Sequence, residues 1–211
     1  MSKAEQRSHG APPSDHAGGF SRRAFLKGSG AAAAATAIAG GNGLAAEEAK
    51  TSVVAGQTAI TLDVNGQKQK LTVEPRTTLL EALRLGLNLT GAKPISVDGS
   101  SGGSTVLVDG KPAAANTLLA LECVGKKIET IEGFSNGKTD PVASAFVHHD
   151  ASQCGFCTPG FVMAIKAFLK KNPKASEAEI RAGLNGNLCR CGTYANIIPA
   201  VLDVVKGGGN G

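Results

Sequence analysis

Four of the five cysteines in this 211-residue chain fall in two tight pairs, and these pairs restrict what the chain can fold around. The first pair is Cys154 and Cys157, and the second is Cys189 and Cys191. Each pair stands beside the start of a predicted helix, where free amide groups and the helix dipole favour thiolates. The residues between the pairs suffice for two helices to run out and back. Both pairs can therefore meet at one end of a helical domain.

Four thiolates that meet in this way suit several kinds of site. Two disulfides or a redox-active dithiol are alternatives, but a Cys-x-Cys pair does not easily bridge to itself, and the surroundings are helical rather than loop-rich. Zinc is the stronger rival. Paired zinc ligands are usually two to four residues apart, so the spacing of Cys189 and Cys191 is atypical for zinc. Spacing alone favours an iron-sulfur cluster and leaves zinc open.

The first 45 residues resemble a twin-arginine (Tat) export signal. Arg22 and Arg23 precede an Ala-rich run at 31–39, and small residues suit cleavage before Ala46. A soluble Ala-rich helix is the alternative, but nearby glycines disfavour it. The run is shorter than the ~20 residues of a membrane-spanning helix. We therefore expect a periplasmic protein without a transmembrane segment, in which 46–57 is a polar linker. Such export suits a protein that folds around a cofactor before translocation.

Composition argues for a folded chain and against nucleic acid as a partner. Hydrophobic residues make up 42% of the sequence, enough to bury real cores. The net charge of +5 falls to +2 when the five basic and two acidic residues of the first 45 are removed. No cluster of cations remains that would bind phosphates.

The residues from 58 to 134 predict a small α+β domain. Alternating residues at 59–64 and 71–73 flank Asn65-Gly66, which indicates a hairpin. Leucines at helical spacing then predict a short helix that begins after Thr77 or Thr78 and ends near Gly86. A Gly- and Ser-rich loop follows at 91–103. Further strands are predicted at 105–108, 118–122 and 127–131.

The residues from 135 to 206 predict a four-helix bundle. Thr158 before Pro159 indicates a helix N-cap, and Ser176 with Glu179 forms a capping-box pattern. The four helices are predicted at 141–148, 159–171, 177–185 and 194–205. The remaining residues, 207–211, are expected to be a disordered tail.

Two motifs around the cysteines carry a family resemblance. Residues 153–160 read QCGFCTPG, and residues 186–194 read GNLCRCGTY. Together they resemble the helical cluster domain in the small iron-sulfur subunits of molybdenum hydroxylases, the relatives of xanthine dehydrogenase and aldehyde oxidase. The resemblance extends upstream and covers nearly all of 58–205. It implies a ferredoxin-like β-grasp domain at 58–134, followed by a four-helix-bundle domain that binds a [2Fe-2S] cluster through Cys154, Cys157, Cys189 and Cys191.

The resemblance also implies the surroundings in which the chain works. It implies a non-catalytic electron-transfer subunit that docks on a large molybdopterin-binding subunit, where an aldehyde or an N-heterocycle is oxidised. Gln153 then contacts the pterin, and a flavin subunit or a cytochrome c accepts the electrons. The alternative is a non-redox module, in which zinc stabilises a docking domain or a cofactor chaperone.

The chain departs from the family at a second cluster site. Relatives carry a plant-type set of four cysteines there, where this chain has Ser96, Ser101, Ser104 and Asn116. The register is kept, but a serine alkoxide is far more basic than a thiolate and Asn116 has no ionisable group. We therefore expect one [2Fe-2S] cluster in the chain and a cluster-free β-grasp domain. Cys123, on a predicted strand, is expected to be a buried small hydrophobe.

Overall fold

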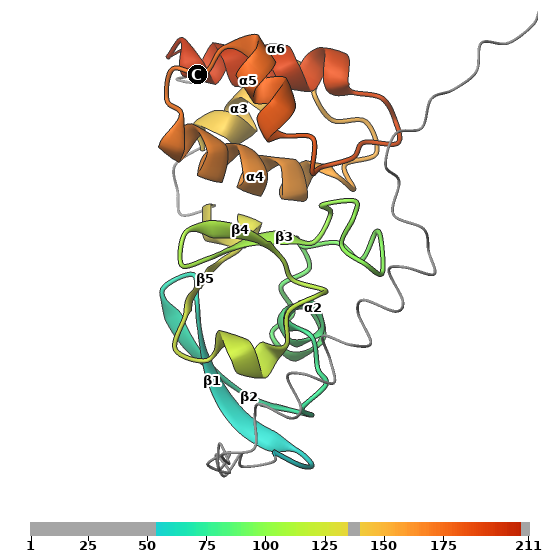
Figure 1. Ribbon diagram of the computed structural model, residues 1–211, viewed down its shortest axis with the longest axis vertical. Helices are drawn as coiled ribbons and strands as arrows, with labels where there is room; N and C mark the ends of the chain where they lie inside the picture. Colours follow the sequence, from blue (N-terminus) through green and yellow to red (C-terminus); the bar gives the residue numbers. More distant parts are fainter. Residues whose placement is uncertain (1–53, 135–139, 208–211) are drawn as a thin grey trace, which may run out of the picture. The chain divides into compact units, whose positions relative to one another are not determined.

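The computed structural model describes residues 54–134 and 140–207. The predicted signal segment, most of the predicted linker, residues 135–139 and the predicted tail from 208 onward lie outside these ranges. The described chain is mixed α and β, as predicted: a five-stranded sheet comes first and four helices follow it (Figure 1).

The sheet begins with the predicted hairpin. Asn65 and Gly66 both have positive φ, 53° and 77°, which a tight two-residue turn between twisted strands requires. The strands are β1 (Thr58–Val64), β2 (Gln67–Val73), β3 (Thr105–Val108), β4 (Lys111–Ala114) and β5 (Lys127–Glu129). Their order across the sheet is β2-β1-β5-β3-β4. Strands β1 and β5 pair in parallel, with Val64 beside Ile128, and the other pairs are antiparallel.

The strand prediction was wrong in three places. Residues predicted as a strand at 118–122 instead lead into a 3-10 helix, η2 (Ala120–Cys123), because the Glu122 carboxylate accepts a hydrogen bond from the Leu119 backbone N–H. Strand β4 was not predicted, since it lacks alternation and contains Pro112. Strand β5 is short, and η3 (Ile131–Phe134) follows it. Cys123 is buried, as expected, but on η2 rather than on a strand.

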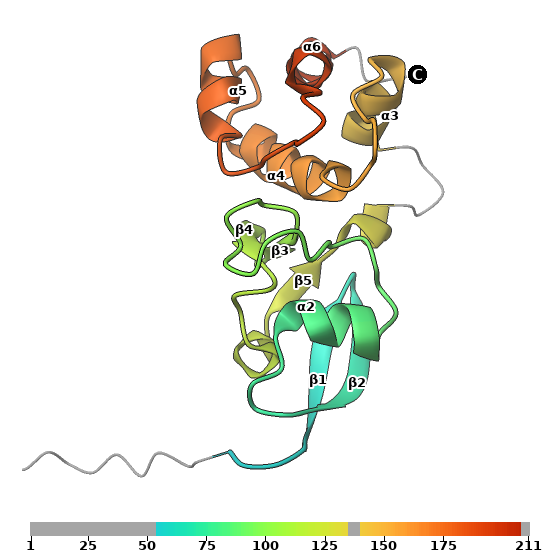
Figure 2. The same cartoon turned by 90° about the vertical axis from the view of Figure 1, so that its right-hand side faces the viewer.

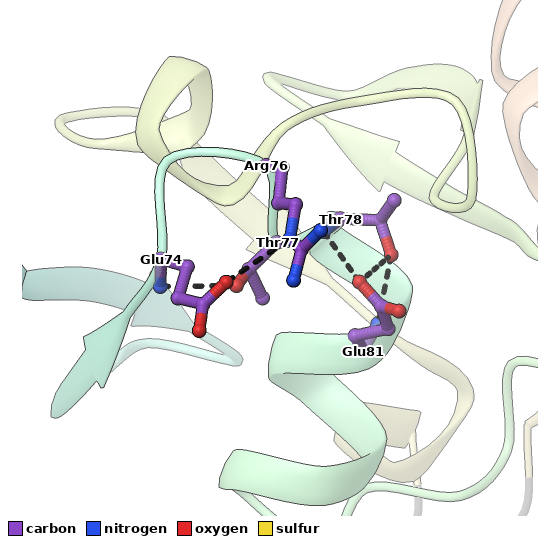
Figure 3. Close-up of polar contacts among 5 residues, drawn as sticks. All are labelled: Glu74, Arg76, Thr77, Thr78 and Glu81. Carbon is purple, nitrogen blue, oxygen red and sulfur yellow. Dashed lines mark hydrogen bonds and ion pairs between the residues drawn. The ribbon is translucent and has the colours of Figure 1, made fainter. Parts of the chain in front are cut away.

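A short helix follows the hairpin, and its start is fixed by a capping box (Figure 3). It consists of α2 (Leu79–Glu81), which continues as one π-helical turn, η1 (Ala82–Gly86). Thr78 is the N-cap: its hydroxyl accepts from the Glu81 backbone N–H, and the Glu81 carboxylate accepts from the Thr78 N–H at 2.8 Å. The helix buries Leu79, Leu80 and Leu83 in the core of the sheet half, whereas Leu85 is exposed.

The four later helices are largely as predicted. They are α3 (Pro141–His148), α4 (Thr158–Lys171), α5 (Glu177–Gly183) and α6 (Tyr194–Val205). The capping box of Ser176 and Glu179 is confirmed. Two details were wrong: α5 ends at Gly183 rather than at 185, and Thr158 lies inside α4, with Cys157 at the N-cap. No described helix has the length and apolar character needed to cross a membrane.

Two hydrophobic cores lie in the sheet half and the helical half, and a third cluster joins the halves. The sheet half packs around Leu62, Leu79 and Ile128, and the helices pack around residues such as Phe161 and Ile197. The joining cluster consists of Leu107 on β3 with Met163 and Ala167 on α4. Helix α4 accordingly faces the β3-β4 end of the sheet (Figure 2).

Candidate metal centre

The first cysteine pair lies in the segment that connects α3 to α4. Cys157 is the N-cap of α4, and its carbonyl accepts the first helical hydrogen bond, from the Phe161 N–H, at 3.1 Å. Gly155, between the two cysteines, has φ of 76°, a conformation that glycine adopts without strain. Cys154 is exposed, whereas Cys157 is 9% exposed. The start of α4 therefore fixes the inner member of this pair.

The second pair lies in the segment that connects α5 to α6, and residues at the start of α6 hold it. The Cys189 backbone N–H donates to the Tyr194 hydroxyl at 2.7 Å, and the Cys189 sulfur lies 3.1 Å from the Thr193 hydroxyl oxygen. The ring of Tyr194 packs edge-on against Phe161 of α4. Cys189 is 8% exposed and Cys191 is exposed, so each pair has one inner and one outer thiol.

The fold brings the two pairs together. The side chains of Cys157 and Cys189 lie close enough to shift each other's pKa, and so do those of Cys154 and Cys191. The thiols are thus arranged as two contacting pairs, each with one member from each segment. Within the described residues, no three Cys, His, Asp or Glu side chains are arranged to hold a single metal ion.

The surroundings give the inner thiols different acidities. Burial and the contact with Cys189 raise the pKa of Cys157 to about 12. Burial also acts to raise the pKa of Cys189, but hydrogen bonds from the Thr193 hydroxyl and backbone amide outweigh it and lower that pKa to about 7. Donors to sulfur stabilise the thiolate, which is the form that binds metals. Cys189 is therefore the more acidic of the two inner thiols.

The outer thiols influence each other. The Phe156 backbone N–H, followed by the Cys191 thiol, lowers the pKa of Cys154, while the contact with Cys154 raises the pKa of Cys191. Four thiol ligands in two contacting pairs fit a [2Fe-2S] cluster, since each of its two irons takes two protein ligands.

Two exposed apolar residues, Phe156 and Leu188, stand directly before the inner cysteines in the sequence. Phe156 and Leu188 are each 52% exposed, and the ammonium group of Lys93 lies 5.7 Å from the centre of the Phe156 ring. Gln153, immediately before the first cysteine, is exposed.

The four residues at the degenerate cluster site also lie together. The Ser96 and Ser101 hydroxyl oxygens are 2.8 Å apart, and the Ser96 hydroxyl accepts from the Ser101 N–H at 3.0 Å. Ser104 donates to the Asn116 side-chain oxygen at 2.5 Å, and the Asn116 amide donates to the carbonyls of Ser96 and Val97. The kept register thus corresponds to a real cluster of side chains, joined by hydrogen bonds.

Sequence reasoning missed the contacts that support Cys189. Thr193 and Tyr194 were recognised only as part of a motif, and Asn187 was given no role. A polar residue placed four or five positions after a ligand is a usable signal, because the first turn of a helix folds back on the preceding loop.

Two family models match the chain. A [2Fe-2S] binding domain matches residues 130–202, and a TAT (twin-arginine translocation) pathway signal sequence matches residues 19–39.

Among curated proteins, the nicotine 6-hydroxylase small subunit of Paenarthrobacter nicotinovorans is 41% identical over 144 residues, which are 68% of this chain and 87% of that protein. The aldehyde oxidoreductase iron-sulfur-binding subunit PaoA of Escherichia coli (strain K12) is 38% identical over 200 residues, which are 87% of each chain.

Solved structures give the same result. A chain of quinoline 2-oxidoreductase from Pseudomonas putida 86 is 39% identical, with a TM-score of 0.69, and the match covers 74% of this chain and 98% of that one. Aldehyde oxidoreductase from Desulfovibrio gigas is 34% identical, with a TM-score of 0.66, and the match covers 70% of this chain and 17% of that longer one.

Proposed function

Since this chain belongs to the family of small iron-sulfur subunits of the molybdenum hydroxylases, we propose that it is the electron-transfer subunit of an exported member of that family. We assign one [2Fe-2S] cluster to Cys154, Cys157, Cys189 and Cys191. The observation that carries this assignment is the pair of thiol contacts, Cys157 with Cys189 and Cys154 with Cys191.

The bound cluster supplies a centre that accepts and releases one electron at a time. The protein holds its ligands and controls their surroundings. Thr193 is placed to donate to the Cys189 sulfur, and Tyr194 fixes the Cys189 backbone. The low exposure of Cys157 and Cys189 keeps water from one side of the site. Such supporting contacts set ligand orientation and redox potential.

We propose two domains: a ferredoxin-like β-grasp domain at 58–134 and a four-helix-bundle cluster domain at 135–206. Their separate hydrophobic cores support this division. We further propose that the β-grasp domain carries no cluster. Its former ligand positions hold hydroxyl and amide groups that are hydrogen-bonded to one another, and these groups are poor ligands for iron-sulfur clusters.

The partner is a large subunit that binds molybdopterin and oxidises an aldehyde or an N-heterocycle. The relatives support this reaction class, since their names refer to nicotine, an aldehyde and quinoline. We propose that exposed Gln153 contacts the pterin. The Tat signal match supports export to the periplasm, where a flavin subunit or a cytochrome c accepts the electrons.

Metal analysis and spectroscopy of the purified chain test the proposal. We expect visible absorption bands, an S = 1/2 signal by electron paramagnetic resonance (EPR) after reduction, and about two irons per chain. About four irons would contradict a cluster-free β-grasp domain. Stoichiometric zinc without visible bands would support the non-redox alternative instead.

A pair of cysteine variants supplies the matched control. Cys189→Ala removes a proposed ligand and is expected to abolish the EPR signal. Cys123→Ala removes the buried cysteine of the sheet half and is expected to keep both iron and signal. Equal iron in the two variants would overturn the ligand assignment.

A further inference from the structure

The loop at 96–104 holds three of the four former ligand positions. Hydrogen bonds of its own serines and of Asn116 hold both of its ends. Ser96 and Ser101 join across its first turn. Ser104, at its end, is tied through Asn116 to the Ser96 carbonyl. This loop contains three glycines at 99, 102 and 103, so its backbone has little intrinsic preference for one conformation. The four side chains add to the few backbone hydrogen bonds that order the loop.

The same loop is hydrogen-bonded to the segment that precedes Cys189. The Ser101 carbonyl accepts from the Leu188 N–H at 3.0 Å. The Gly102 carbonyl accepts from the side-chain amide of Asn187, also at 3.0 Å, and from the Thr105 hydroxyl at 2.7 Å. Asn187 is 7% exposed, so this contact is shielded from water. Two successive carbonyls of the loop thus bind the two residues before a proposed cluster ligand.

Gly102 also lies against the segment that follows Cys157. A Cβ placed on Gly160, in the first turn of α4, would lie 2.3 Å from the Gly102 carbonyl oxygen. A Cβ placed on Gly102 itself would lie 2.6 Å from the Gly186 carbonyl oxygen. Because both glycines are packed backbone to backbone, a small movement of the loop displaces its neighbours. The loop therefore contacts both cysteine-bearing segments.

We propose that Ser96, Ser101, Ser104 and Asn116 are positioning residues for the cluster in the other half of the chain. They hold the loop at 96–104 in the one shape that fixes Leu188 and thereby Cys189. This inference rests on the proposed function for its redox consequence, but the positioning itself is a property of the chain. The loop at 96–104 thus supports the segment before Cys189, although its own positions no longer carry cysteines. We call this support the brace.

Loss of these side chains is expected to affect both the order of the loop and the reduction potential of the cluster. A loop that loses its internal hydrogen bonds samples more conformations. The hydrogen bond from the Leu188 N–H to the Ser101 carbonyl then breaks more often, which exposes the N–H to solvent. A cluster's reduction potential depends on hydrogen bonds to its sulfurs and on its exposure to water. A looser Cys189 segment changes both quantities, even though the altered residues are not among the proposed ligands.

Amide hydrogen exchange of residues 187–193, measured on the full chain, tests the brace directly. Ser96→Ala and Asn116→Ala are expected to speed exchange at Leu188 about tenfold, as the loss of one or two hydrogen bonds predicts. The matched control is Ser100→Ala, in the same loop, whose hydroxyl bonds only the exposed Asp98. Ser96→Thr keeps a hydroxyl and is expected to restore slow exchange.

The same variants also test the effect on the redox properties of the cluster. Ser96→Ala and Asn116→Ala are expected to keep about two irons but to shift the EPR g-values and the midpoint potential, while Ser100→Ala matches the wild type. Asn187→Ala, which removes the hydrogen bond to the Gly102 carbonyl from the other side, is expected to give the same shift while the bonds of Ser96 and Asn116 remain.

The two proposals fail in different ways. Unchanged exchange at Leu188 in Ser96→Ala, Asn116→Ala and Asn187→Ala would overturn the brace, whatever metal the chain holds. A wild-type chain without iron would overturn the proposed function, and faster exchange in the variants would still support the brace.

Discussion

The backbone N–H of Cys189 donates to the phenol oxygen of Tyr194 at 2.7 Å, and the ring that carries this oxygen packs against Phe161. Tyr194 begins α6, and Phe161 lies in the first turns of α4. One side chain thus ties a proposed ligand to both helices whose starts flank the site. The geometry of the site depends on helix packing as well as on the cysteines themselves.

Tyr194→Phe separates these two roles, because it removes the hydroxyl and keeps the ring. We expect a loss of about 0.5–1.5 kcal/mol in the free energy of unfolding, the usual contribution of one hydrogen bond, together with a changed EPR line shape. Urea unfolding and EPR measure the two effects. Thr117→Val, which removes an exposed hydroxyl bonded at 3.0 Å to the Ala114 carbonyl in the sheet half, is the control and is expected to leave the EPR signal unchanged.

Thr193→Val tests the hydrogen bond to the Cys189 sulfur. A thiolate can only accept, so the hydroxyl must donate to it and withdraw electron density from the ligand. Its loss is expected to make the midpoint potential more negative by roughly 60 mV, the one-electron equivalent of ~1.4 kcal/mol. Potentiometric titration followed by EPR measures this shift. Thr193→Ser keeps the hydroxyl, and an equal shift in that variant would show that packing, rather than the hydrogen bond, is responsible.

Restoring cysteines at Ser96, Ser101, Ser104 and Asn116 is expected to rebuild a second cluster. The side chains at these positions already contact one another, and the loop keeps its glycines. Iron content is expected to rise from about two to about four per chain, with a second EPR signal. The triple variant that leaves Asn116 in place is the control. If the quadruple variant still holds two irons, the loop has lost more than its sulfur ligands.

The pKa of Glu179 is lowered, first by the Ser176 hydroxyl and then by the Ser176 backbone N–H. A lowered pKa means that the carboxylate stabilises the folded state above its unfolded pKa, and that this contribution disappears as the pH falls through the folded pKa. Glu179→Gln is therefore expected to lower the unfolding midpoint in urea at pH 7 and to match the wild type near about pH 2. In a Ser176→Ala background the substitution is expected to have a much smaller effect at pH 7.

Local patterns predicted most of the elements. The hairpin follows from Asn65-Gly66, and the start of α5 follows from Ser176 and Glu179, because each feature depends on residues a few positions apart. The segment at 118–122 was wrongly predicted as a strand because its apolar residues suit a strand and a 3-10 turn equally well. The hydrogen bond from the Leu119 N–H to the Glu122 carboxylate stabilises the 3-10 turn. Strand β4 forms because it pairs with β3. The sequence Lys111-Pro112 gives no sign of this pairing.

In the site, too, local features could be predicted from the sequence, and contacts between distant segments could not. The meeting of the two cysteine pairs could be predicted from the helix lengths between them. The contacts of Cys189 with Thr193 and Tyr194, and of Asn187 with Gly102, could not, since these depend on how the helices and the loop pack in three dimensions. The serine register was visible in the sequence, but the hydrogen bonds that join its members were not.

The parallel pairing of β1 with β5 has a consequence for how the chain acquires its structure during synthesis. Val64 lies beside Ile128, so the first hairpin has no partner in the sheet until β5 has left the ribosome. Contacts between residues so distant in the chain form slowly, because a long loop must close before they contribute. The helical half depends on a distant pairing too, because α3 packs against α6, the last helix of the chain. Both halves are therefore expected to complete their packing only after the last elements that they need have been synthesised.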